Sequence, residues 1–477
     1  MISKLQKTAV YILCVTLLCG AGGFASAANI YVNDSQSVLG TDIGTAYVIG
    51  GDGSVVVAAD TYVITGSGVQ KLGTTSTTPG GAPEIPSGES DGTTVSTKYK
   101  TVRVGLKYAS SALSSANLQN EVGWGYQFGY YDSDRVFHST GSTNENKITM
   151  TPTGSGREVT VTVTGTDTVL YVHDGSSAYN LAVHPLSDGA SAETWFKGYT
   201  YFGDFEYFRY DSKGLTVINV VSIDDYVKCV VPYEMSPSWP IEALKAQAVC
   251  ARSYFAANVN SSYAKYGFDV TATTSSQAYS GTGGTSANSN AAVEATAGEY
   301  LTYDGKICNA VYSSSSGGGT ENSENVFYSA LGYLRGVPDP FHDEVPSSMN
   351  SYKEWHRELT GEQLAAKTGN AIGAVTSVEP TYSATGNVIA LKLSDANGRS
   401  YTFTKDECRT KMGMPSIHYT IEPSTSSYGT FVIDGGGWGH NVGMSQFGAY
   451  AMAKNHGYNY RQILRYYYTG VSISKAV

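Results

Sequence analysis

Short runs in which apolar and polar residues alternate recur along most of this chain, with glycine and aspartate between them. This pattern predicts β-strands. The strand candidates beyond residue 100 are Thr101–Leu106, Val159–Val163, Thr168–Val172, Phe205–Tyr210, Leu215–Val221, Val388–Leu393 and Phe431–Ile433.

Apolar residues at helical spacing appear in three places. The first predicted helix has Pro240 in its first turn, where the missing N–H costs little, and continues to Phe255. The second begins after Ser445 as N-cap, and the third runs from about Asn459 to a stop at Gly470. Because these helices do not alternate regularly with strands, we predict an α+β fold.

The first 27 residues have the layout of an export signal. Lys4 and Lys7 precede an apolar run from Ala9 to Leu18, and Ala25–Ala27 forms a small-residue cleavage site. Since the run is short for a bilayer span, we expect cleavage after Ala27 and export of the protein. The alternative is a retained signal acting as an anchor, and we expect contact with a membrane only in that case.

Composition divides the rest of the chain into three parts. Residues 28–71 hold strand-like runs such as 54–59 and 61–64, which predict a β-rich segment. Residues 72–97 are rich in Gly, Ser, Thr and Pro, so we expect a linker or an ordered surface loop. Residues 98–477 are long enough to form the main domain.

Charge and composition narrow the classes of partner. The formal net charge is −10, and the loss of Lys4 and Lys7 makes it −12. Such a chain is poorly suited to nucleic acid, whose binding relies on basic residues that meet phosphates. Charged residues make up only 15% of the chain, whereas 37 tyrosines and 54 glycines are present. Aromatic faces pack on pyranose rings, so this composition fits a sugar-binding surface, although it also fits an ordinary exported β-rich protein.

Four cysteines follow the signal segment, namely Cys229, Cys250, Cys308 and Cys408. They form no C-x-x-C pair and have no histidine at metal-ligand spacing, so a zinc site is not predicted. Disulfides and isolated buried thiols both remain open.

Glu234 is the leading candidate for acid–base chemistry. The segment Val230–Met235 sets it among apolar residues, and partial desolvation raises the pKa of a carboxyl group towards that of a general acid. The helix predicted just after it favours the charged form instead. The residues alone therefore leave open both the net pKa shift and the choice between a catalytic and a solvated helix-start glutamate.

Six long motifs lie between Ile223 and Gly470. They are Ile223–Met235, Ile241–Tyr254, Ser276–Gly281, Ser314–Glu321, Gly437–Ala449 and Ile463–Gly470. In this order they resemble the motifs of the stage II sporulation protein D / amidase-enhancer family (SpoIID/LytB). The resemblance is most literal in Glu-Ala-Leu-Lys-Ala-Gln-Ala at 242–248 and in Gly-Met-Ser-Gln at 443–446. The first hundred residues lie outside it.

The resemblance implies a mixed, β-rich domain with a few helices around a glycan-binding groove. It also implies peptidoglycan glycan strands as the partner and a location in the cell wall or at the outer face of the membrane. The family includes lytic transglycosylases that cleave the β-1,4 bond between N-acetylmuramic acid and N-acetylglucosamine and form a 1,6-anhydro product. Their catalytic glutamate corresponds to Glu234.

A single carboxyl group suits this reaction. One glutamate can protonate the leaving oxygen and accept the proton of the C6 hydroxyl, whereas hydrolysis typically uses two carboxyl groups. The family also includes enhancers of cell-wall amidases. The alternative is therefore a non-catalytic, peptidoglycan-binding enhancer whose partner is an N-acetylmuramoyl-L-alanine amidase.

Ten further residues of these motifs are candidates for substrate binding. Each also has a structural alternative, such as an ion pair, a core position, a tight turn or a helix cap. The ten are Arg252, Gln277, Tyr279, Ser316, Gly317, Gly318, Thr320, His440, Ser445 and Gln446.

Two departures from the family pattern bear on the site. Some members carry a Cys/His zinc cluster before the position of Gln277, but residues 271–276 hold no such ligand, so we predict neither metal nor cofactor. Cys229 and Asn441 stand where the family has glycine, and we expect both side chains close to the groove.

Two other chemistries fit the sequence poorly. Residues 443–448 miss the G-x-S-x-G spacing of serine hydrolases by one position, and the glycine-rich run 435–443 lacks dinucleotide-binding spacing. A surface-array or adhesion role for the first hundred residues, with the remainder as an anchor, is a further hypothesis. The sequence does not distinguish a role in sporulation from one in vegetative growth.

Overall fold

The computed structural model of the protein describes residues 85–477, apart from residues 99, 155, 188–192, 211–213, 260 and 274–275. Within the first 84 residues, which form a separate unit, it describes six short strands. Four make an antiparallel sheet and two make a hairpin: β1 (Leu13–Val15), β2 (Ala28–Tyr31), β3 (Tyr47–Ile49), β4 (Val55–Val57), and β5 (Tyr62–Thr65) with β6 (Gly68–Lys71). The strands expected in 54–59 and 61–64 are thus confirmed. The expected signal peptide, except for β1, and residues 72–84 of the expected linker lie outside the described residues.

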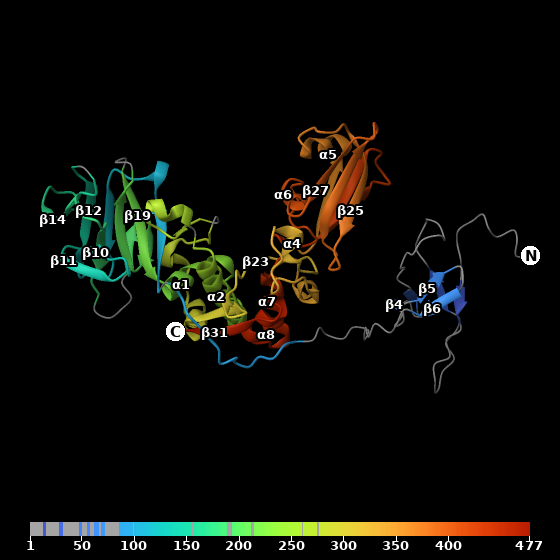
Figure 1. Ribbon diagram of the computed structural model, residues 1–477, viewed down its shortest axis with the longest axis horizontal. Helices are drawn as coiled ribbons and strands as arrows, with labels where there is room; N and C mark the ends of the chain where they lie inside the picture. The colour runs from blue at the N-terminus through green and yellow to red at the C-terminus, as the bar shows by residue number, and fades with distance from the viewer. Residues whose placement is uncertain are drawn as a thin grey trace, which may run out of the picture. The chain divides into compact units, whose positions relative to one another are not determined.

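Two sheets form the first half of the larger unit and pack face to face (Figure 1). Apolar rings join them, as where Phe128 stacks on Tyr171 and Phe196 contacts Phe205. The first sheet has the order β11-β10-β15-β18-β19-β8-β20, with β8 (Thr101–Lys107), β10 (Tyr126–Tyr131), β11 (Phe137–Thr143), β15 (Leu181–Pro185), β18 (Asp204–Arg209), β19 (Leu215–Ser222) and β20 (Val270–Thr271). The second has the order β14-β13-β12-β9-β16-β17, with β9 (Ala116–Asn120), β12 (Lys147–Pro152), β13 (Val159–Val163), β14 (Val169–His173), β16 (Glu193–Phe196) and β17 (Tyr199–Phe202).

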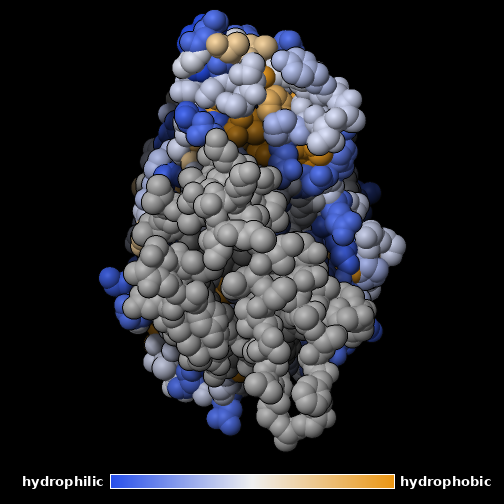
Figure 2. Space-filling view, turned by 90° about the vertical axis from the view of Figure 1, so that its right-hand side faces the viewer, coloured by the Kyte–Doolittle hydropathy of each residue, from blue (hydrophilic) through white to orange (hydrophobic). Residues whose placement is uncertain are grey.

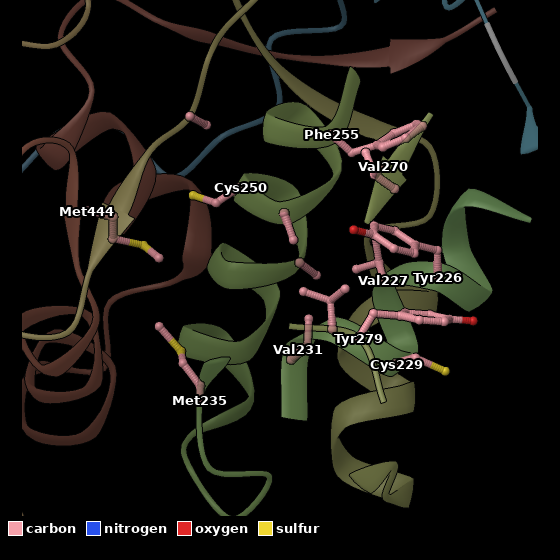
Figure 3. Packing of buried hydrophobic residues seen from close by; sticks show 14 of the residues in the cluster. Tyr226, Val227, Cys229, Val231, Met235, Cys250, Phe255, Val270, Tyr279 and Met444 are labelled. Atoms are coloured by element: carbon pink, nitrogen blue, oxygen red, sulfur yellow. The ribbon is translucent and has the colours of Figure 1, made fainter. Parts of the chain in front are cut away.

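The helix that ends at Glu234 is one of five in the described residues that were not predicted. α1 (Ile223–Glu234) begins after Ser222, whose hydroxyl accepts a hydrogen bond from the backbone N–H of Asp225 at 3.1 Å. Its valine-rich run favours a strand locally, and Pro232 in the last turn is a weak helix former. Burial of one face against α2 outweighs that preference (Figure 3).

The three predicted helices are confirmed. α2 (Ile241–Ala257) starts one residue later than expected, with Pro240 as its N-cap. α7 (Gln446–His456) begins after Ser445, whose hydroxyl accepts from the N–H of Gly448 at 3.2 Å. α8 (Tyr460–Tyr467) follows Asn459. The other helices are α3 (Ala287–Ala295), α4 (Ser323–Val326), α5 (Gly361–Lys367) and α6 (Glu407–Thr410), with 3-10 turns η1 (Ala109–Ser111), η2 (Ser261–Tyr266), η3 (Gly281–Gly284) and η4 (Pro340–Glu344).

The second half of the larger unit holds four smaller sheets. β22-β21-β31-β7 consists of β22 (Lys306–Ile307), β21 (Glu299–Tyr303), β31 (Ser472–Ala476) and β7 (Thr94–Val95), and the short parallel pair consists of β23 (Tyr312–Ser313) and β30 (Met444–Ser445). Two three-stranded sheets form an insertion, drawn in orange in Figure 1: β24 (Trp355–Thr360), β29 (Thr430–Gly435) and β28 (Tyr419–Pro423); β25 (Val375–Tyr382), β26 (Val388–Asp395) and β27 (Ser400–Thr404). The chain is therefore α+β, as predicted.

On the face seen in Figure 2, the coloured residues are largely hydrophilic, with apolar residues gathered in one area. In the described part of the chain, every helix is too short or too polar to span a bilayer.

Candidate active site

Glu234 is the last residue of α1, and a six-residue connection leads from it to α2. Its side chain is half-buried. Burial is the main influence on the Glu234 carboxyl group and raises its pKa above the usual range. Hydrogen bonds from the Tyr312 side chain, the backbone of Ala278 and the Gln446 side chain act in the opposite direction, but the pKa stays raised.

From the sequence, the start of the following helix was expected to favour the charged form of Glu234, but the structure places Glu234 at the end of its own helix. The helix that holds Glu234 ends there, and the C-terminal end of a helix carries a partial negative charge that disfavours a carboxylate. Burial and the C-terminal end of α1 therefore both destabilise the charged form of Glu234. Both effects favour a protonated Glu234, as a general acid requires.

Tyr312 and Gln277 form one side of the Glu234 surroundings. The Gln277 amide nitrogen donates to the Tyr312 hydroxyl at 3.2 Å, and the Gln277 oxygen accepts from the Tyr226 hydroxyl at 3.2 Å. Gln277 is buried, and a pocket of about 120 Å³ opens beside it and Tyr254. Gln277 thus holds Tyr312 in position, and Tyr312 in turn contacts the carboxyl group.

Gln446 forms the other side. It is the first residue of α7, and its amide nitrogen donates to the Gln247 oxygen at 3.2 Å. Gln247 is fully buried in α2, and among the described residues its own amide nitrogen has no hydrogen-bond partner. Three separate segments, β23, α7 and the stretch around Gln277, therefore meet at Glu234.

Arg252 and Tyr279 are both committed to internal contacts. The Arg252 guanidinium is fully buried, donates to Asp224 Oδ1 at 2.8 and 3.0 Å, and donates to the carbonyl oxygen of Glu299 at 3.1 Å. Tyr279 is buried, donates to the Asn219 side chain at 2.5 Å and stacks on Tyr226, as the cluster in Figure 3 shows. These contacts match the ion pair and the core position that were the structural alternatives.

Ser316 and Ser445 lie on different motifs but bind the same buried carboxylate. Asp339 accepts from the Ser316 hydroxyl at 2.6 Å and from the Tyr467 hydroxyl at 2.9 Å, and Ser445 is a third partner. A Cβ atom on Gly448 would lie 2.7 Å from both Asp339 carboxylate oxygens, so this position requires glycine. The cluster joins the two loops to each other, and both hydroxyls are used inside the protein.

The remaining loop candidates are held by the backbone. Gly317 and Gly318 have φ values of 76° and 124°, which favour glycine, and a Cβ on Gly317 would lie 2.3 Å from the oxygen of Gly436. The Thr320 hydroxyl accepts from the N–H of Val337 at 2.9 Å. Of the four candidates in this loop, the two glycines are partly exposed, whereas Ser316 and Thr320 are buried.

His440 is neutral. Burial, together with the charge of Arg409, lowers the pKa of His440 to about 4, although a hydrogen bond to the backbone of Tyr312 acts in the opposite direction. Its Nδ1 accepts from the N–H of Val442 at 3.0 Å. The ring therefore fixes the loop that leads to α7. Its hydrogen bond to the backbone of Tyr312 also helps to hold that residue in position.

Cys229 and Asn441, whose side chains were expected close to the groove, are both fully buried. Cys229 lies in the apolar cluster of α1 (Figure 3). Asn441 has φ of 60°, which asparagine tolerates better than most residues, and donates to the oxygen of Ser316 at 2.7 Å. It stabilises the loop from inside.

The cysteines and acidic residues give no metal-binding group. Cys229, Cys250, Cys308 and Cys408 are all buried free thiols, which is one of the two alternatives left open by the sequence. Across the described residues, no three or more His, Cys, Asp or Glu side chains gather so as to hold a metal ion.

Two residues at the site were missed from the sequence, Tyr312 and Gln247. Tyr312 lies two residues before the Ser314–Glu321 motif, and Gln247 is part of the helical motif of α2. Their place inside or beside a motif was the available signal. Only the fold reveals that Tyr312 contacts Glu234 and that Gln247 contacts Gln446, a partner of Glu234.

Comparison with known proteins places these motifs in a family. The family model for Stage II sporulation protein matches residues 211–303. Stage II sporulation protein D of Bacillus amyloliquefaciens is 33% identical over 54% of this chain and 75% of its own length. The chain belongs to the stage II sporulation protein D family. An uncharacterized protein of Brachyspira hyodysenteriae is 36% identical over 58% of this chain and 73% of its own length.

Two further matches extend the picture. The Amidase enhancer of Bacillus subtilis is 31% identical over 52% of this chain, and the match spans only 40% of that protein. A family model described as a domain of unknown function matches residues 343–443, which include the whole insertion. This member of the family thus carries a second, separately recognised segment.

Proposed function

We propose that this protein remodels peptidoglycan as a lytic transglycosylase, with Glu234 as its single acid and base. The observation that carries the proposal is the half-buried carboxyl group at the end of α1, whose pKa burial raises. A protonated Glu234 donates its proton to the glycosidic oxygen between N-acetylmuramic acid and N-acetylglucosamine. The resulting carboxylate then accepts the proton of the C6 hydroxyl as that oxygen bonds to the anomeric carbon.

The surroundings of Glu234 support one carboxyl group rather than two. The groups that act on it in the described part of the chain are a phenol, an amide and a backbone N–H, and no second carboxylate is among them. Hydrolysis typically needs a second carboxylate as nucleophile or base. An attacking hydroxyl supplied by the substrate removes that need.

Of the substrate-binding candidates, Gln277 and Gln446 remain closest to the reaction in this proposal. Both act on Glu234 directly or through Tyr312. Gly317 and Gly318 stay candidates for backbone contact with the glycan. For Arg252, Tyr279, Ser316, Thr320, His440 and Ser445 we propose a positioning role, because their polar groups already have partners inside the protein.

The second candidate function is enhancement of a cell-wall amidase without catalysis. It rests on the relative named Amidase enhancer, although the match spans less than half of that protein. In this case the same groove binds glycan and presents it to a N-acetylmuramoyl-L-alanine amidase. Export to the cell wall is part of both proposals.

One experiment separates the two functions. Glycan strands stripped of stem peptides are incubated with the wild-type protein, with Glu234→Gln, and with the exposed-site control Glu354→Gln. We expect 1,6-anhydro-muramyl fragments by mass spectrometry from wild type and control but not from Glu234→Gln. Binding of strands without fragments from any of the three contradicts the transglycosylase. In that outcome, faster release of stem peptides when an amidase is added supports the enhancer.

A further inference from the structure

The insertion returns to the main fold through an exposed tryptophan. After β29 ends at Gly435, the chain passes Trp438 and enters β30 at Met444. Trp438 is 46% exposed, and its ring lies on that of Tyr352 with centroids 4.2 Å apart. Tyr352 is itself half-buried, so one face of Trp438 is supported and the side chain remains accessible.

Backbone hydrogen bonds hold this aromatic pair rigidly. The N–H of Gly437 donates to the carbonyl oxygen of Tyr352 at 2.7 Å. Trp438 and Ser315 exchange two backbone hydrogen bonds, at 2.9 and 3.2 Å. The Ser315 hydroxyl is in turn held by Asn350 at 2.9 Å and by His342 at 2.8 Å. A fixed ring loses little conformational entropy when it binds a ligand.

The segment that pairs with Trp438 also contains Tyr312, which contacts Glu234. Ser315 lies three residues after Tyr312, which spans at most about 11 Å of extended chain. A pair of residues that exchange both hydrogen bonds has its Cα atoms roughly 5.5 Å apart. The backbone of Trp438 is therefore within about 16 Å of that of Tyr312, a few sugar rings along a glycan strand.

Aromatic side chains also lie along this route. Phe447 follows Gln446, and its N–H donates to the carbonyl oxygen of Ser314 at 3.0 Å. Its ring lies 4.9 Å from that of Trp239, which is on the connection between α1 and α2. Both rings are partly exposed. Two half-buried aromatic rings thus lie near the Glu234 connection and beside Ser314, the residue before Ser315.

We infer that the two ends of the insertion, where it joins the main fold, supply a distal glycan subsite, in which Trp438, supported by Tyr352, stacks on a pyranose ring of a β-1,4-linked amino-sugar strand bound at Glu234. This inference rests on the proposed function, since the strand must run from Glu234 to Trp438. It gives the insertion, which matches a domain of unknown function, a role in grasping long strands. The C–H faces of amino sugars suit stacking on an aromatic ring such as that of Trp438.

The test measures binding rather than cleavage, so it is independent of whether Glu234 is catalytic. Oligomers of β-1,4-linked N-acetylglucosamine with three to eight rings are titrated by calorimetry into Glu234→Gln protein. We expect affinity to rise with length and then to level off. Trp438→Ala is expected to weaken binding of the longest oligomers about tenfold, while that of the trimer changes less than twofold.

Two variants guard against trivial outcomes. Trp124→Ala removes a tryptophan that is 57% exposed in the β-rich half and is expected to leave all affinities unchanged. Trp438→Leu keeps apolar bulk without a ring and is expected to lose the same length dependence if Trp438→Ala folds poorly. Equal loss for all lengths, no loss in either Trp438 variant, or no binding of any oligomer overturns the subsite. If the cleavage assay yields no anhydro products but the binding titration still depends on oligomer length, only the catalytic proposal is refuted.

Discussion

The ion pair between Asp224 and Arg252 joins α1 to α2, and Asp224→Ala is expected to destabilise the fold by about 3 kcal/mol. Arg252 is fully buried, whereas the Asp224 side chain is 38% exposed. The substitution leaves the guanidinium inside the protein without its carboxylate, and its remaining acceptors among the described residues are the carbonyl oxygens of Glu299 and Ala248. Breaking a buried pair in this way typically costs 3–5 kcal/mol, and water entering at the exposed Asp224 position brings the loss to the lower end.

Calorimetric unfolding and urea titration measure this loss. For a folded unit of residues 85–477, an unfolding entropy of about 2.1 cal/mol/K per residue converts it to a Tm lower by about 4 °C. Lys392→Ala is the matched control, because it removes the Lys392–Glu379 pair, which is 44% and 61% exposed. That variant is expected to lose less than about 1 kcal/mol. Equal losses for the two variants would refute the argument from burial.

The same variant tests the role of Arg252. If the guanidinium serves only to join the helices, Asp224→Ala and Arg252→Lys lower the Tm but bind stripped glycan strands normally well below it. Lysine cannot reproduce the forked contact with Asp224, so Arg252→Lys should be destabilising as well. Loss of glycan affinity with an unchanged Tm would make Arg252 a ligand of the substrate instead.

Three further predictions concern the site. Tyr312→Phe removes a hydrogen bond that lowers the Glu234 pKa, so the alkaline limb of the kcat/KM profile for glycan cleavage should move to higher pH; an unchanged limb would separate Tyr312 from the acid. The pKa of His440 is about 4 in the folded protein and roughly 6.5 in the unfolded chain. Its contribution to the free energy of unfolding, up to about 3 kcal/mol, is therefore present above pH 6.5 and is lost as the pH falls to 4. Urea titrations should find a flatter pH dependence in His440→Asn, and an equally steep one would contradict a buried neutral ring. Gly448→Ala places a Cβ 2.0 Å from the Tyr467 hydroxyl, so the Tm should fall although alanine favours helices; a raised Tm would indicate that the cluster yields easily.

Local features of the sequence were sufficient for part of this fold, including three of the eight helices in the described residues. Ser445 was predicted as a helix cap from the residue types around it, and its hydroxyl does accept the N–H of Gly448. Alternating runs such as Leu215–Val221 were predicted as strands, and β19 occupies Leu215–Ser222. The fold class and the family also followed from the sequence, because caps, periodicity and motifs involve residues close together in the chain.

What the sequence could not determine depends on contacts between distant residues. The valines of α1 favour a strand locally and Pro232 disfavours a helix, but the segment is a helix because its apolar face is buried against α2. Arg252 has the character of a ligand for an acidic sugar, but the fold brings Asp224 to it from 28 residues away and closes it off from solvent.

The Glu234 site divides in the same way. The sequence determined the residue and its apolar neighbours, but not the direction of its pKa shift, since an apolar setting and a nearby helix end oppose each other. The tertiary structure decided it by ending α1 at Glu234 and by burying the carboxyl group. It also brought Tyr312 and Gln446 to that carboxyl from 78 and 212 positions further along the chain. Burial and long-range hydrogen bonding arise only from packing, so they are the properties that the three-dimensional structure alone supplies.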